Sequence, residues 1–320
     1  MASSLRPVLT GQSIKIPRSR RRSVLGEIYA RRISYLFLLP AFLSVLVFMV
    51  EPTFSGFFYA FTDWNPGFQD VHFIGLENFA ALFQDATLGI GVRNVVEIVL
   101  ATVLKNLTVP LLVAELIFHL RSPRLQYWLR TLFVVPMVMP AIAVILLWVQ
   151  IYDPNIGLFN QILGGAGLQS LQHAWLGDPL TALPAIIFVG FPWVHVLPFL
   201  ILLGGLMSIP QELYDAATVD GARWSARFLQ IELPMLVGQI KLLVVLSVID
   251  GFQGFYNILV MTGGGPFTST TVPALEMYYA AFQDSKYGYA CAIAFALFLV
   301  ILLITVVNMT FLKSGVEYEA

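Results

Sequence analysis

The sequence predicts an all-α integral membrane protein with six transmembrane helices. Of its 320 residues, 58% are hydrophobic and only 12% are charged, and the mean hydropathy is +0.79. This composition is too apolar for an ordinary water-soluble domain. Six apolar segments are each long enough to cross the hydrocarbon layer as a helix, which takes roughly 20 residues. Helices are expected because lipid offers no hydrogen-bond partner to a bare backbone.

The six expected spans follow from hydrophobicity and length. In chain order they are Tyr35–Phe61, Gly91–His119, Trp128–Tyr152, Thr181–Leu206, Leu236–Met261 and Tyr289–Phe311. The first is longer than the apolar core of a signal peptide, about 7–15 residues, so we expect it to remain as a membrane anchor.

Prolines interrupt the third and fourth of these spans. Pro136 and Pro140 lie in the third, and Pro184, Pro192 and Pro198 lie in the fourth. Each removes a backbone donor, so we expect both helices to bend. Bent helices surround cavities in transporters, but proline is also frequent in membrane helices in general, and the sequence leaves both explanations open.

Loop charges predict the orientation of the spans. Arginines crowd the connections between spans two and three and between spans four and five, whereas the other loops are mainly acidic. The positive-inside rule then places both termini in the cytoplasm. We expect a basic tail over 1–34, a membrane domain over 35–313 and a short tail over 314–320. A nucleic-acid-binding arm is the alternative for the basic tail, but a positive flank beside a span is commoner, so we expect no nucleic-acid partner.

A polar insert, PQELYDAATVDGARWSARFLQIELP, separates spans four and five at Pro210–Pro234. The letters SIPQ, which overlap the start of this insert, match a capping box in which Ser208 and Gln211 cap a short helix. Gly221 permits a backbone reversal, after which a second amphipathic piece follows. Small alanines with acidic neighbours suit docking into a groove. The candidate docking residues are Glu212, Asp215, Ala216, Ala217, Asp220 and Gly221. An ordinary solvated helix pair is the alternative.

The order of residues in this insert resembles the EAA loop of permease subunits in ATP-binding-cassette importers. The resemblance includes Asp215-Ala216-Ala217, Gly221, Ile231 and Pro234, with aspartate in place of the usual leading glutamate. FTDWNP, FIGLENFAALFQD, WLGDP and TGGGP are similar to stretches of carbohydrate importers of the maltose and glycerol-3-phosphate permease type. The resemblance implies that residues of about 208–234 form coupling helices that dock on an ATPase subunit.

The same resemblance implies the rest of the assembly. It comprises a second homologous permease subunit, two ATPase subunits and an extracytoplasmic solute-binding protein, in a bacterial or archaeal cytoplasmic membrane. ATP and Mg²⁺ are expected on the ATPase subunits, and the imported substrate is expected to be a carbohydrate.

The chain carries few signs of chemistry of its own. It lacks the G-x-x-x-x-G-K-[ST] phosphate loop, and its four histidines show no H-E-x-x-H spacing for zinc. Cys291 is the only cysteine, which excludes an internal disulfide. We therefore expect no catalytic residue, no bound metal and no cofactor on this chain. His195 is expected to be hydrogen-bonded within the protein rather than to relay protons.

Polar residues inside two spans are candidates for the substrate path. Lys105 and Asp250 fall near the middle of spans two and five, where a charge is costly, so an ion pair and direct substrate contact are both open. Asp250, Gln253 and Asn257 are spaced to share one helical face, with Tyr256 nearby. Amides, carboxylates and an aromatic ring suit a sugar, although polar contacts between packed helices are the alternative. Lys105 raises the possibility of an acidic sugar.

Two other functions remain as alternatives. An ion-coupled secondary transporter or channel would need neither ATPase nor binding protein, and it predicts an ion-coupling cluster or paired broken helices. A membrane-embedded enzyme would need a convergent nucleophile, base or metal.

Overall fold

The computed structural model describes residues 32–67 and 70–311. Apart from turns, loops and one isolated antiparallel bridge between Thr62 and Phe73, these residues are helical, which confirms the all-α prediction. Most of the basic N-terminal tail, Lys313 and the C-terminal tail lie outside the described residues. Contacts divide the chain after Ser55 into two units.

The first span begins in the N-terminal unit, and its last helix runs past the boundary at Ser55. Helix α2 (Arg32–Val45) continues through one π-helical turn, η1 (Leu46–Val50), into α3 (Glu51–Tyr59). Together they make 28 residues, long and apolar enough to cross a membrane. The first predicted span is therefore confirmed as a helix.

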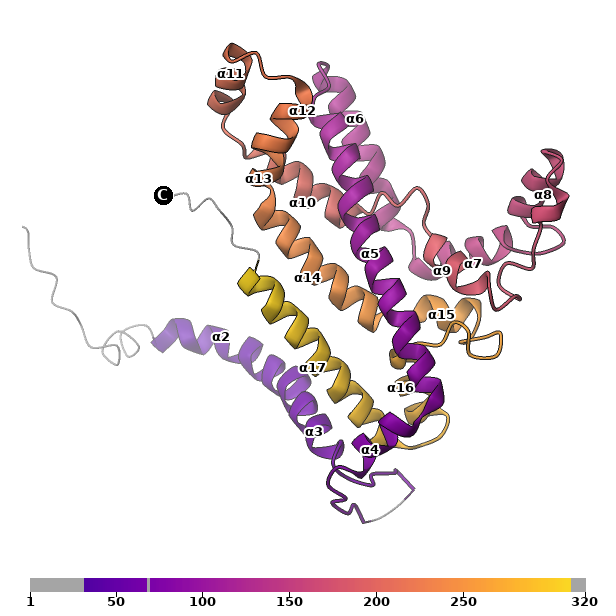
Figure 1. Ribbon diagram of the computed structural model, residues 1–320. Coiled ribbons are helices and arrows are strands. Elements are labelled where there is room, and N and C mark those ends of the chain that lie inside the picture. Colours follow the sequence, from indigo (N-terminus) through magenta and orange to yellow (C-terminus); the bar gives the residue numbers. More distant parts are fainter. Residues whose placement is uncertain (1–31, 68–69, 312–320) are drawn as a thin grey trace, which may run out of the picture. The chain divides into compact units, whose positions relative to one another are not determined.

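Three further long apolar helices belong to the C-terminal unit. They are α5 (Ala86–Phe118), α14 (Val237–Gln253) continued by α15 (Tyr256–Met261), and α17 (Tyr287–Phe311). Asp85 caps α5, because its side chain accepts the backbone amides of Thr87 and Leu88. Helix α5 packs along α14 and along α10 (Val196–Met207), and α17 packs on α14 (Figure 1).

The third predicted span is broken rather than continuous. Helix α6 (Pro123–Val134) and the 3₁₀ turn η2 (Val135–Val138) meet α7 (Ala141–Ile151) at an angle of 90°. Pro136 lies in η2, and Pro140 directly precedes α7. The predicted bend is therefore present, and the span is formed by a bent pair of helices.

The fourth predicted span is also interrupted. Helix α9 (Ala182–Phe188) ends before a turn in which Gly190 and Trp193 have φ of 84° and 58°, and α10 follows. Pro192 stands inside this turn. Helix α10 is in turn bent by 65° from α11 (Gln211–Val219). Among the described residues, four helices are long enough to span a membrane, or up to six when each bent pair counts as one.

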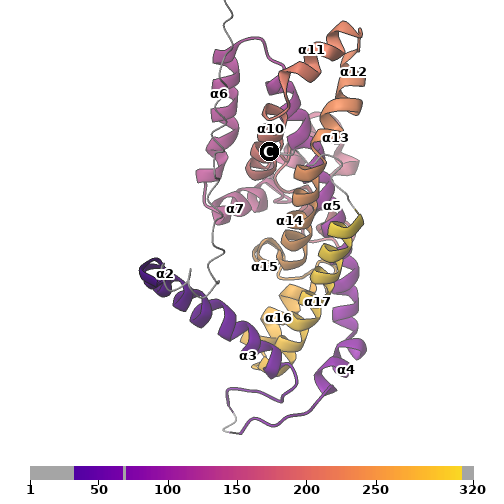
Figure 2. The same cartoon turned by 90° about the vertical axis from the view of Figure 1, so that its left-hand side faces the viewer.

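Short elements occupy the connections. They are α4 (Glu77–Gln84), α8 (Leu158–Gly165), η3 (Gln169–Leu171), α12 (Trp224–Arg227), η4 (Phe228–Glu232), α13 (Leu233–Met235) and α16 (Pro273–Phe282). Within the C-terminal unit, α11 and α12 lie at the end where α5 finishes, and α4 and α16 lie at the opposite end (Figures 1 and 2).

Two apolar clusters form the core of this unit. One lies where α5 meets α14, α15 and α16 and includes Val99, Phe252 and Leu275. The other joins the end of α5 to α10, α11 and the start of α14, with Phe199 and Leu236 at its centre. The two clusters hold the broken elements against α5, and polar side chains lie between them.

Candidate functional site

A cavity of about 240 Å³ lies among α5, the α9–α10 connection, α14 and α15. Its lining residues are Ile98, Thr102, Lys105, Ile186, Ile187, Val189, Gly190, His195, Asp250, Gly251, Gly254, Asn257 and Ile258. The helix breaks at Gly190 and Gly254 bring backbone into the lining. Irregular backbone at membrane depth is tolerated where it lines a cavity, because its polar groups find partners there.

Lys105 and Asp250 both line this cavity, and of the two arrangements that the sequence left open, the ion pair is not formed within the described residues. The Lys105 ammonium donates to the Ile187 carbonyl at 2.8 Å, and no ion pair joins it to Asp250 among the described residues. The interruption after α9 explains this, because it frees a carbonyl that a continuous helix would have used. Asp250 is exposed. Both charged groups are thus presented to the cavity.

His195 is hydrogen-bonded within the protein, as expected. Its Nδ1 contacts the Oδ1 atom of Asn106, and because that oxygen only accepts, Nδ1 carries the proton. The Nδ2 atom of Asn106 donates to the Ser247 hydroxyl at 2.8 Å. Asn106 and Ser247 are buried. This chain of contacts fixes the His195 ring at the cavity wall and links α5, α10 and α14.

The polar residues of the fifth span do not share one helical face. Helix α14 ends at Gln253, and Gly254 adopts φ −75° and ψ 86° before α15 begins at Tyr256. Asp250 and Asn257 still line the cavity, whereas Gln253 and Tyr256 are exposed and are not part of its lining. The single-face prediction was wrong because it assumed an unbroken helix.

The polar insert begins differently from the capping-box prediction. The Ser208 hydroxyl donates back to the Gly205 carbonyl at 2.7 Å, and Pro210 stands at the start of α11 with no side-chain cap. Gln211 instead donates to Asp215 at 3.0 Å, one turn further on. Ser208 still ends α10 in a helical conformation, so its hydroxyl satisfies a carbonyl of that helix.

The end of α11 is a Schellman motif. The Ala222 amide donates to the Ala217 carbonyl at 2.8 Å, and the Gly221 amide donates to the Thr218 carbonyl at 3.1 Å. Gly221 has φ of 69°, which a residue with a side chain rarely adopts. The predicted reversal at Gly221 is therefore present, and α12 follows it.

The two alanines of α11 differ in their surroundings. Ala217 is buried together with Tyr214, so it packs against the chain's own core. Ala216 is exposed on the other face, as are Glu212, Asp215 and Asp220. Val219 is 87% exposed. A partner surface would therefore meet Ala216 and its acidic neighbours, and Ala217 would support them from beneath.

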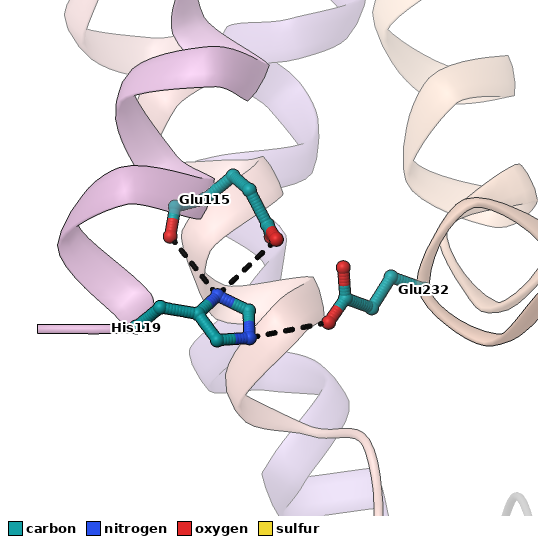
Figure 3. Close-up of side chains that lie close together, drawn as sticks. All are labelled: Glu115, His119 and Glu232. Atoms are coloured by element: carbon teal, nitrogen blue, oxygen red, sulfur yellow. Dashed lines mark hydrogen bonds and ion pairs between the residues drawn. The ribbon is translucent and has the colours of Figure 1, made fainter. Parts of the chain in front are cut away.

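A cluster that sequence reasoning missed lies beneath α12. Glu115 and His119, one turn apart at the end of α5, face Glu232 of η4 (Figure 3). His119 Nδ1 lies 3.2 Å from Glu115 Oε1, and His119 Nε2 lies 3.5 Å from Glu232 Oε1. Burial, followed by the Glu115 charge, raises the pKa of Glu232 to about 7. Helical spacing could have paired Glu115 with His119, but only the fold brings Glu232 to them.

Comparisons with known proteins agree with this architecture. The probable ABC transporter permease protein YurN of Bacillus subtilis is 33% identical over 286 residues, which cover 89% of this chain and 97% of that protein. The multiple sugar-binding transport system permease protein MsmF of Streptococcus mutans is 32% identical, covering 87% of this chain and 94% of its own. The trehalose/maltose transport system permease protein MalF of Thermococcus litoralis is 33% identical, and the match covers 89% of this chain and 94% of that protein.

The fold is similar to that of a solved transporter. A chain in the crystal structure of a bacterial ABC transporter that imports the acidic polysaccharide alginate has a TM-score of 0.79 and 23% identity, covering 92% of this chain and 100% of that chain. Residues 106–313 match the family described as binding-protein-dependent transport system inner membrane component. The chain therefore belongs to this family of membrane-embedded transport permeases.

Proposed function

We propose that this chain is one of two membrane-spanning subunits of an ATP-driven importer, and that it carries a sugar or oligosaccharide delivered by an extracytoplasmic binding protein. The observation that carries this is the pairing of a polar cavity at mid-span with an exposed coupling segment, α11 and α12, at one end of the same helices. Relatives named as sugar permeases support the substrate class.

The coupling segment would transmit force from the ATPase subunits. Helix α11 is anchored by Tyr214, which belongs to the same apolar cluster that holds α10 and the end of α5, and its Ala217 is also buried. A push on its exposed face would therefore move helices that reach the cavity. ATP and Mg²⁺ would be bound by the partner subunits, and this chain would have no enzymatic activity of its own. Both termini and the coupling segment would face the cytoplasm, at a bacterial or archaeal inner membrane.

A sugar suits the cavity chemistry. Asn257 offers an amide, Asp250 a carboxylate, and His195 an imidazole held in a fixed orientation. These groups can bind hydroxyls in several directions. Lys105 favours a second candidate, an acidic sugar, because its ammonium lies in the lining and donates to a backbone carbonyl, with no ion pair among the residues that the structure describes. The solved relative that imports alginate makes a uronate-containing oligosaccharide the natural choice for this test.

The test is uptake by the complex purified from the source cells and reconstituted into proteoliposomes with its binding protein. We expect uptake of neutral and uronate sugars to require ATP inside the vesicles and to parallel sugar-stimulated ATP hydrolysis. Uptake driven by an ion gradient without ATP would instead support a secondary transporter. If a uronate oligosaccharide inhibits uptake more strongly than a neutral oligosaccharide of equal length, the acidic sugar is the better substrate.

A further inference from the structure

The Glu115, His119 and Glu232 cluster contains buried charge that the protein leaves unsatisfied. Glu232 is 0% exposed, and among the described residues neither of its carboxylate oxygens accepts a hydrogen bond of normal geometry, although the buried Tyr214 hydroxyl acts on it. Glu115 is 4% exposed, and its Oε2 also has no partner, while its Oε1 accepts from the Trp224 indole at 3.0 Å. Buried carboxylates without partners are costly, so this arrangement calls for a cation or a proton.

One nearby positive charge, the Arg227 guanidinium, does not neutralise the two carboxylates. The Arg227 guanidinium acts on Glu232 through its charge, but no ion pair joins them within the described part of the chain. When both carboxylates are ionised and His119 is neutral, two carboxylates and one guanidinium leave one negative charge. The cluster therefore has room for at least one more positive charge.

The orientation of His119 favours a metal ion over a proton. Its Nδ1 lies 3.2 Å from both the Glu115 backbone carbonyl and Glu115 Oε1, so Nδ1 carries a proton and donates it there. Metal-binding histidines are typically held in this way by a carbonyl or carboxylate on the far nitrogen. The Nε2 atom is then left to face Glu232 Oε1, as Figure 3 shows.

The distance between His119 Nε2 and Glu232 Oε1 bears on whether a metal ion or a proton lies between them. A protonated Nε2 paired with a buried carboxylate should form a bond of about 2.7–2.9 Å. The observed separation is 3.5 Å. Two ligands on a tetrahedral zinc ion, each bonded at about 2.0–2.1 Å, lie about 3.3–3.4 Å apart. The gap is longer than a charge-assisted hydrogen bond and close to the separation of two ligands on one ion.

We propose that Glu115, His119 and Glu232 form a binding site for a divalent transition-metal ion, with Zn²⁺ the best match to one imidazole and two carboxylates. One donor atom from each residue lies within 4.8 Å of the others. His119 is 29% exposed, which gives the ion a route in and leaves space for water as a fourth ligand. The bound metal would tie the end of α5 to η4, directly ahead of α14.

The experiment is zinc titration of the full chain, purified in detergent, with its affinity tag removed and residual metal stripped by a chelator. Competition with a chromophoric zinc indicator measures affinity and stoichiometry. We expect one Zn²⁺ per chain, and a tetrahedral absorption spectrum when Co²⁺ replaces it. Glu232→Gln and His119→Gln should each weaken binding by at least about 100-fold, since even supporting residues around metals contribute about 10–100-fold.

His72→Gln is the matched control, because it removes another histidine beside a carboxylate, 3.1 Å from Asp63, and leaves the cluster intact. It should bind zinc like the unmodified chain. Circular dichroism of each variant without metal establishes that its helices are formed. The site is disproved if the unmodified chain binds no stoichiometric zinc, which would indicate protonation alone, or if both cluster variants retain the original affinity.

Discussion

Gly251 of α14 lies directly against Val99 of α5. A Cβ atom added at Gly251 would come within 2.8 Å of a Val99 side-chain carbon and 3.0 Å of the Val99 Cα. The second contact is with backbone, so a rotamer change cannot relieve it. This close approach sets the distance between two helices that both line the cavity.

Gly251→Ala should therefore destabilise the protein. Overpacking typically costs about 1–3 kcal/mol, which outweighs the gain of up to about 1 kcal/mol from replacing a helical glycine. Gly238→Ala on the same helix is the control, because a Cβ there meets nothing within 4 Å. Thermal unfolding in detergent should show a lower midpoint for Gly251→Ala and an equal or higher one for Gly238→Ala. Equal midpoints in the two variants would mean that α5 and α14 are not packed this closely.

Asn94 should be essential for the turn before α16. Its buried amide donates to the Ser269 and Thr271 carbonyls at 3.0 and 2.9 Å. Asn94→Asp keeps the shape of the side chain but replaces its NH2 group with a carboxylate oxygen. That oxygen cannot donate to the two carbonyls. Since each unsatisfied buried group costs about 1–3 kcal/mol, we expect a loss of at least about 2 kcal/mol in thermal unfolding. Asn155→Asp, at an exposed position, should change little.

The cavity charges should govern transport rather than folding. Asp250→Asn and Lys105→Gln remove one charge each while keeping similar size. A hydrogen bond to a charged group contributes about 1.5–3 kcal/mol, so we expect uptake efficiency to fall by about 10–100-fold. Lys286→Gln, which loses only a contact at 3.5 Å with Asp284, should transport normally. Unchanged uptake with Asp250→Asn and Lys105→Gln would remove the cavity from the substrate path.

The exposed face of α11 should be the part that meets the ATPase. Ala216→Trp adds bulk to that face without disturbing the core, so we expect it to block assembly of the complex or to uncouple ATP hydrolysis from uptake. Leu229→Trp, at a 59% exposed position in η4, is the control. Ala217→Trp is less informative, because Ala217 is buried. Normal sugar-stimulated hydrolysis in Ala216→Trp would contradict the docking assignment.

The sequence predicted the helical class well, because the apolar segments and the reversal at Gly221 depend on local properties. It failed where the chain leaves a regular helix. Pro192 predicted a bend in the fourth span, but continuous hydrophobicity concealed the break at Gly254, and both breaks determine which polar groups reach the cavity. Glu232 was out of reach for another reason. Its partners are distant in sequence, and only the packing of η4 against the end of α5 brings them together.

The proposed function requires α11 to be a cytoplasmic surface that binds an ATPase subunit. The most direct measurement places a cysteine at exposed Glu212, with Cys291→Ser removing the only native thiol. A membrane-impermeant maleimide is then applied to intact cells and to permeabilised cells, with a crosslinker added to the latter. We expect labelling only after permeabilisation, and a crosslink to an ATPase subunit. Labelling of intact cells from outside would contradict the account.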